Sequence, residues 1–388
     1  MKTKTNRNKS TTSTITGVFS LHFAALALGM MFGSAPDAAG QTYTLAKIHL
    51  PSGSFRGGAN GINNHGVVVG NNSIMSGKQE VTGPGFVWAN GTAISLPYLP
   101  APLRGASPRD ISDNGLIVGY GTVEGDLYAP RAVWWQAAPG GGYATGDWNA
   151  LLPAGSSWTL LNAWAVSDDG QFVAFSGANT ATGVRSAMVG RLDPGGLTVW
   201  TIPTIGNPPV NLSEGSAYAI HFDGNTVQVT GSCRPAGTTQ RLAFRAELDV
   251  TTGATAAIAL DSRSSSGRSI NVFGTAVGTT NSSGACVWNV DGSIVPLPTL
   301  GGAANSAADI NDSGFVVGRS TRSGRNSLEH AFLWHPTTGM RDLNSLKSAS
   351  DTSGIELMAA FRINAAGQII ARGVIKNRYQ DVVMTPAP

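Results

Sequence analysis

The sequence is poor in charge, in cysteine and in long apolar runs. Charged residues make up 13% of the 388 positions, and cysteine occurs twice. Long helices need uninterrupted runs of Ala, Leu, Glu and Lys, whereas 50 glycines are spread along this chain. After the first forty residues, no run is long and apolar enough to span a bilayer. The frequent Val, Ile, Thr and Ser instead predict short strands joined by tight glycine turns.

The sequence also lacks the motifs that commonly mark an active site. It contains no G-x-S-x-G, H-E-x-x-H, C-x-x-C or phosphate-loop pattern. We therefore assign no catalytic, cofactor-binding or metal-binding residue. We expect no cofactor, and no ligand-binding residue can be named.

The two cysteines, Cys233 and Cys286, leave two interpretations open. In an oxidising compartment they could form a disulfide, since they belong to neighbouring repeats. Cys286 also stands where sister repeats carry the core residues Phe332 and Val382, which favours a buried free thiol.

The first forty residues have the three parts of a secretory signal peptide. Residues 2–9 carry four basic side chains, Ile15–Phe32 is mostly apolar, and the small residues Ala38–Gly40 precede a cut before Gln41. An uncleaved membrane anchor is the alternative. Cleavage near Gly40 predicts a secreted, periplasmic or cell-surface protein.

Removal of this segment also changes the charge balance. The whole chain has 26 basic and 23 acidic side chains, and the chain after residue 40 keeps 22 of each. A protein that neutralises phosphates needs a surplus of Lys and Arg, so we expect no nucleic-acid partner.

One motif recurs throughout the remaining chain: Ile-Asn-x-x-Gly followed by a short apolar run. Its turn glycines stand 40 to 55 residues apart. An Asn or Ser side chain bonds the backbone two residues on, and glycine accepts a positive φ, so each copy predicts a hairpin. Glycines inside the return strand, such as Gly70 and Gly318, indicate close approach of another backbone. The seven copies are Ile62–Gly70, Ile111–Gly119, Val166–Ala174, Ile220–Gln228, Ile270–Gly278, Ile310–Gly318 and Ile363–Ala371.

Two further strands accompany each hairpin. One resembles Ala331–Trp334, A-F-L-W, and the next ends in Leu-Pro, as in Thr92–Pro100. Four strands per unit and seven units predict an all-β fold, a seven-bladed β-propeller over residues 41–388. The opening strand Tyr43–Pro51 has nothing before it, so we expect it to complete the last blade and close the ring. An open stack of β-units is the alternative.

These residues resemble the bacterial HAF repeat family of extracellular proteins. The tripeptide that names the family stands at His330–Phe332, and Leu300–Trp334 matches its wider pattern closely. The resemblance covers nearly all of the chain after the signal, although residues 160–250 have lost most of the signature. It implies a secreted or surface protein and brings no catalytic residue set.

Several side chains are candidates for a metal-binding or ligand-binding site. The turns Asp110–Gly115 and Asp309–Gly314 echo the start of a calcium loop but lack its final Glu, so the hairpin interpretation is preferred. His330 and His335 lie five apart on a strand, which points them to opposite faces and disfavours a metal. Four tryptophans of the less regular repeats fit either a carbohydrate platform or core plugs: Trp135, Trp148, Trp158 and Trp164.

The function predicted from the sequence is a secreted or surface-exposed, non-catalytic repeat protein. It would act as a monomeric binding module for a glycan, an envelope component or a protein, or as a purely structural module. The alternative is a carbohydrate-active enzyme whose two carboxylates come from separate blades. The six glutamates available to such a site are Glu80, Glu124, Glu214, Glu247, Glu329 and Glu356.

Overall fold

The computed structural model of the protein describes residues 40–123, 126–203, 212–235, 238–324 and 328–387. The predicted signal peptide, residues 1–40, lies outside the described residues except for Gly40. Within these ranges the helices are two short 3₁₀ turns, η1 (Trp148–Leu151) and η2 (Leu343–Leu346). None of the described helices could reach across a membrane.

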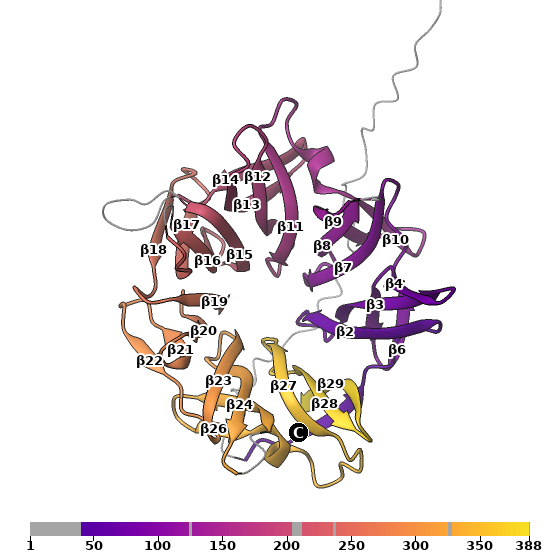
Figure 1. The fold of residues 1–388 in the computed structure, drawn as a ribbon, viewed down its shortest axis with the longest axis vertical. Coiled ribbons are helices and arrows are strands. Elements are labelled where there is room, and N and C mark those ends of the chain that lie inside the picture. Colours follow the sequence, from indigo (N-terminus) through magenta and orange to yellow (C-terminus); the bar gives the residue numbers. More distant parts are fainter. Residues whose placement is uncertain (1–39, 124–125, 204–211, 236–237, 325–327, 388) are drawn as a thin grey trace, which may run out of the picture. The chain divides into compact units, whose positions relative to one another are not determined.

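Seven antiparallel sheets stand around a central opening (Figure 1). We number the blades 1 to 7 by the order of their innermost strands. The innermost strands are β2 (Ser54–Ile62), β7 (Leu103–Ile111), β11 (Trp158–Val166), β15 (Leu212–Phe222), β19 (Ser265–Ile270), β23 (Gly301–Ile310) and β27 (Glu356–Ile363). The second strands are β3 (Val68–Ser76), β8 (Ile117–Val123), β12 (Phe172–Asn179), β16 (Thr226–Pro235), β20 (Ala276–Thr280), β24 (Val316–Arg322) and β28 (Ile369–Ile375).

The outer half of each blade follows the predicted order. The third strands, which carry the A-F-L-W residues, are β5 (Phe86–Ala89), β9 (Asp126–Ala137), β13 (Arg185–Asp193), β17 (Leu242–Asp249), β21 (Gly284–Trp288), β25 (Glu329–His335) and β29 (Arg378–Pro386). The outermost strands are β6 (Thr92–Ser95), β10 (Tyr143–Asp147), β14 (Gly196–Thr201), β18 (Thr255–Ala259), β22 (Ile294–Pro296), β26 (Gly339–Asp342) and β1 (Tyr43–Lys47). The seven-bladed propeller is therefore confirmed, and the open stack is wrong.

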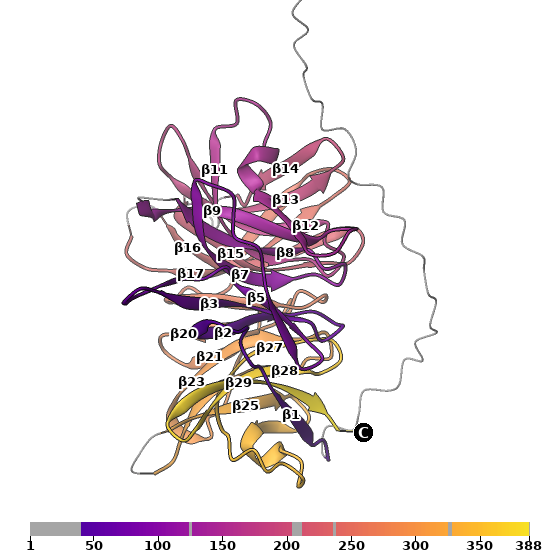
Figure 2. The same ribbon diagram turned by 90° about the vertical axis from the view of Figure 1, so that its right-hand side faces the viewer.

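The ring closes as predicted, with the first strand in the last blade. β1 runs antiparallel to β29, with Tyr43 opposite Pro386 and Lys47 opposite Val382 (Figure 2). Blade 1 departs from four strands, because a short exposed strand, β4 (Gln79–Thr82), adds to β3.

The turn and strand glycines have the roles predicted for them. Every turn glycine of the motif has a positive φ, from 74° at Gly274 to 101° at Gly224. At Gly318, a Cβ would lie 2.1 Å from the carbonyl oxygen of Ser306 on the innermost strand and 2.8 Å from the ring of Phe332. Glycine at this position lets the aromatic plug of the third strand cover the hairpin.

The hydrophobic core consists of seven clusters, one between each pair of neighbouring blades. Phe86 and Trp88 of blade 1, for example, pack with Ile370 and Val383 of blade 7. The clusters of the other blade pairs likewise combine the residue at the motif Ile position, which is Val166 in blade 3, with apolar residues of the second and third strands. Each blade thus buries both faces only when both neighbours are present.

Candidate functional site in the central channel

The innermost strands share one irregularity that shapes the wall of the central channel. In all seven, a β-bulge interrupts the pairing with the second strand at the residue two positions before the motif Ile. A bulge leaves its extra residue unpaired and re-aims its side chain. The bulged residues are Asn60, Arg109, Trp164, Tyr218, Arg268, Ala308 and Phe361.

Four of these residues, from consecutive blades 2 to 5, form a continuous arc. The Arg109 guanidinium carbon lies 5.3 Å from the ring centre of Trp164, whose ring centre lies 5.3 Å from that of Tyr218. Arg268 follows, 5.8 Å from the Tyr218 ring. Tyr218 and Arg268 line a cavity of about 120 Å³ to which all seven blades contribute. We call Arg109, Trp164, Tyr218 and Arg268 the channel arc.

The second strands hold the rings of the arc in place. The indole N–H of Trp164 donates to the hydroxyl of Ser176 (3.2 Å), and the Ser232 hydroxyl donates to that of Tyr218 (3.3 Å). The Arg109 guanidinium donates to the Tyr120 hydroxyl at 3.0 Å. Rings fixed at both face and polar tip are preorganised for contact with a ligand.

A second layer lies one residue closer to the turns, at the position before the motif Ile. Asp110, Asp309 and Arg362 all line the cavity. Asp110 accepts a hydrogen bond from the backbone N–H of Val166 (3.1 Å), and Asp309 accepts one from that of Ile363 (2.8 Å). Each carboxylate therefore links its blade to the next.

The two carboxyl groups of this layer are costly to ionise. Burial raises the pKa of Asp110 to about 7, although the positive charge of Arg362 opposes the shift. Burial likewise raises the pKa of Asp309, again against Arg362 and a hydrogen bond from Ser269. Gly61 of blade 1 makes room for Asp110, since a Cβ there would lie 2.8 Å from its Cα.

The turns of the motif form an acidic mouth at one end of the channel. The Asn64 side-chain amide donates to Asp113 (2.9 Å) and to Asp168 (3.1 Å). Removal from bulk solvent raises the pKa of Asp168, with the negative charges of Asp113 and Asp312 adding to the shift. Asp113 and Asp168 thus share one amide at the turns, where the charge of Asp312 from blade 6 acts on Asp168 and that of His221 opposes it.

The Asn of the motif holds this mouth together in a way that sequence reasoning missed. In four copies its Nδ2 donates to the backbone carbonyl of the equivalent residue in the next blade. The pairs are Asn271 to Asn311 (3.4 Å), Asn311 to Asn364 (3.1 Å), Asn364 to Asn63 (2.9 Å) and Asn63 to Ser112 (3.0 Å).

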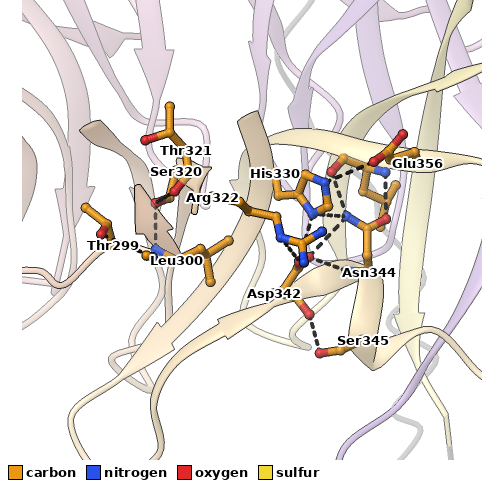
Figure 3. Close-up of polar contacts among 12 residues, drawn as sticks. Thr299, Leu300, Ser320, Thr321, Arg322, His330, Asp342, Asn344, Ser345 and Glu356 are labelled. Carbon is orange, nitrogen blue, oxygen red and sulfur yellow. Dashed lines mark hydrogen bonds and ion pairs between the residues drawn. The ribbon is translucent and has the colours of Figure 1, made fainter. Parts of the chain in front are cut away.

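A second polar cluster surrounds His330 on the third strand of blade 6 (Figure 3). His330 Nδ1 lies 2.7 Å from Asp342 Oδ2, and its Nε2 lies 3.0 Å from Glu356 Oε1 of blade 7. Asn344 contacts the same ring nitrogen as Asp342, at 3.0 Å. Among the described side chains, none with a hydroxyl or thiol hydrogen-bonds to His330, so it lacks the nucleophile that a hydrolase pairs with its base. The cluster ties blade 6 to blade 7.

The candidate metal-binding residues of the sequence lie at separate positions in the structure. His335 bonds Thr337 and the Ser313 carbonyl, apart from the partners of His330. In the two turns considered as calcium loops, Asp110 and Asp309 contact neighbouring blades instead. Across the described ranges, no three His, Cys, Asp or Glu side chains gather as a metal site would require.

Three of the four tryptophans belong to the core. Trp135 and Trp148 are fully buried, and Trp158 packs against the cluster that contains Trp148. Only Trp164 belongs to the channel arc. Both cysteines are buried free thiols, which answers the question left open between a thiol and a disulfide.

No protein-family model and no curated protein matches the sequence. The fold, however, is similar to solved structures of peptidases. The β-propeller domain of the Trilobed protease from Pyrococcus furiosus, described as having an open velcro topology, matches with a TM-score of 0.52 and 9% identity over 88% of this chain and 93% of its own. An acylaminoacyl peptidase from Pyrococcus horikoshii matches with a TM-score of 0.53 and 11% identity over 87% of this chain and 52% of its own. The chain spans about half the length of that peptidase.

At this identity the comparison establishes the fold, and it also corrects the function predicted from the sequence. The propellers that this chain resembles are those of a protease and of an acylaminoacyl peptidase. The prediction of a module that acts by binding alone, together with its carbohydrate-active alternative, is contradicted by these neighbours, whose propellers are parts of peptidases. The chain is similar to peptidase propellers and differs from the open velcro topology of one of them, because β1 pairs with β29.

Proposed function

We propose that the chain is a peptidase-associated propeller whose central channel admits unfolded peptide. The observation that carries the proposal is the channel wall itself, in which one end of a preorganised aromatic and cationic arc, Tyr218 and Arg268, lines a cavity shared by all seven blades. The likeness in fold to peptidase propellers supports it. Peptide hydrolysis is assigned to a catalytic unit that works with the propeller.

The closed ring supports a size filter. The channel is bounded by seven strands, the motif Asn side chains bond the turns of neighbouring blades at four of the seven junctions, and the last blade is sealed by β1. A wall bonded in this way keeps the width of the channel constant. An extended peptide can therefore enter, while a folded protein is excluded.

Peptide binding tests the proposal directly. A panel of fluorescently labelled peptides of 5 to 30 residues is titrated with the purified protein, and anisotropy reports binding. We expect short, unstructured peptides to bind and a folded domain carrying the same sequence in a loop not to bind.

A plugging variant locates the binding site. Ala308 is the bulged residue of blade 6, which follows the Arg268 end of the arc, so Ala308→Trp places a large ring in the channel beside the arc. We expect it to weaken peptide binding at least tenfold, whereas Ala256→Trp on the exposed outer strand β18 leaves binding unchanged. Absence of binding, or equal binding by both variants, overturns the proposal.

We further propose that the protein is exported and belongs with the HAF repeat proteins, as the sequence pattern indicates. The residues that support this are the basic and apolar start of the chain and His330–Phe332 with its flanking pattern. Mass spectrometry of protein recovered outside the cytoplasm should find a mature N-terminus at Gln41. An intact Met1 would refute processing.

A further inference from the structure

The channel arc differs electrostatically from the other cation–aromatic contacts of the protein. Arg191 stacks on Trp200 but pairs with Asp193, and Arg372 stacks on Phe361 but pairs with Asp381. In those contacts a neighbouring carboxylate already neutralises the guanidinium. The guanidinium groups of the arc differ in their charged neighbours.

Neither guanidinium of the arc has a carboxylate partner in the described part of the chain. Arg109 contacts two aromatic rings and the Tyr120 hydroxyl, and its buried Nε has no hydrogen-bond acceptor. Arg268 is exposed, and its guanidinium lies against the Tyr218 ring. A buried donor without an acceptor is costly, and a ligand oxygen would satisfy it.

The two cations bracket an aromatic surface, which defines the chemistry of a complementary ligand. Guanidinium groups bind carboxylates through paired, charge-assisted hydrogen bonds. Between them, Trp164 and Tyr218 meet edge to face at 85° and offer apolar surface beside the charges. A peptide with a carboxylate group next to an apolar segment fits both features.

The acidic mouth determines from which end of the channel an anionic ligand reaches the arc. Asp113, Asp168 and Asp312 lie at the turns, beyond the C-terminal ends of the innermost strands, whereas the arc lies two residues before the motif Ile. The negative mouth repels an anionic peptide, so such a peptide reaches the arc from the opposite end of the channel.

We propose that the channel arc is the carboxylate-binding site of the propeller and makes it selective for acidic peptide segments. This rests on the proposed peptide channel and names its substrate class. The carboxylate comes from an Asp or Glu side chain or from the C-terminus of the peptide.

Four labelled decapeptides of one Gly/Ser/Leu framework test the proposal with the full-length mature protein. Three carry Glu, Gln or Lys at the same four positions and are blocked at both ends, and the fourth is the Gln peptide with a free C-terminal carboxylate. We expect the Glu peptide to bind at least tenfold more tightly than the blocked Gln peptide, with an affinity that falls as salt is added. Tight binding of the unblocked Gln peptide assigns the site to a chain end, and tight binding of the Glu peptide alone assigns it to acidic side chains.

Arg268→Gln isolates the arc, because Arg268 is exposed and its loss leaves the core intact. We expect this variant to weaken binding of the Glu peptide about tenfold and to leave the Gln peptide unaffected. Arg378→Gln, at the exposed start of β29, removes the same charge elsewhere and should change neither.

The outcomes separate the two proposals. Equal affinity for the Glu and both Gln peptides, tighter binding of the Lys peptide, or an unchanged Arg268→Gln variant overturns the carboxylate site while peptide binding stands. Absence of binding for all four peptides overturns the peptide channel as well.

Discussion

Replacing Asp110 by Asn should stabilise the protein above neutral pH. The Asn oxygen keeps the hydrogen bond from the Val166 N–H, while the ionisable group is removed. The pKa of Asp110 rises from 3.8 to about 7 in the folded protein. The folded state therefore holds a proton that the unfolded state has lost between these values, so stability of the natural protein falls as pH rises through this window.

The magnitude follows from the size of this shift. At about 1.4 kcal/mol per pKa unit, ionisation of Asp110 costs at most about 4 kcal/mol of folding free energy at pH 8. Asp110 is half-buried beside an open channel, so water reduces the penalty, and we expect about 2 kcal/mol. The gap between Asp110→Asn and the natural protein should close toward pH 4.

Urea denaturation followed by tryptophan fluorescence at pH 4 to 8 measures this difference. Asp261→Asn is the control of opposite sign. Burial would raise the pKa of Asp261, but hydrogen bonds from Arg263 outweigh burial and lower it. The Asp261 carboxylate therefore stabilises the fold at neutral pH, and this contribution is lost as the pH falls through the lowered pKa. If Asp110→Asn is less stable than the natural protein at pH 8, attraction to Arg362 outweighs burial and the reasoning is refuted.

Three further substitutions or modifications test the architecture. Gly318→Ala should lower the free energy of unfolding by about 3 kcal/mol, because its Cβ meets backbone of the innermost strand, while Gly195→Ala, with nothing within 4 Å, should change it little. Asn311→Ala removes a buried hydrogen bond to the next blade and a partly buried one within its own turn, and should cost about 2 kcal/mol in the same assay, whereas no change would exclude the Asn linkage. Burial raises the pKa of Cys233 and Cys286 to about 12, so iodoacetamide at pH 8 should modify neither until the protein is unfolded, and an intact mass that changes on reduction would contradict free thiols.

The blade could be predicted from the sequence because every copy packs against its neighbours in the same way. The motif Ile or Val and the turn glycine, such as Gly314, keep their roles from copy to copy, and the return-strand glycine, such as Gly318, keeps its role in four copies. The carboxylates vary because they contact neighbouring blades that themselves differ. Asp110 bonds Val166 of blade 3, and no local pattern in its own repeat announces that partner.

The channel arc could have been found only in part. The residue two positions before the motif Ile is large or charged in most copies, beside small neighbours, and this is visible in the sequence at Arg109 and Trp164. The direction in which this side chain points is not visible in the sequence. Strict alternation assigns it to a blade face, whereas the bulge shifts the register by one residue and changes where the side chain points.

The pairing of β1 with β29 makes closure of the ring depend on two strands that are far apart in the sequence. Until Tyr43 and Pro386 meet, blade 7 exposes the unpaired edge of β29. A chain truncated within β29 would keep six blades that could each form, yet no ring. Proteases should attack such a product at its open edge, so this one strand pair tests the integrity of the whole ring.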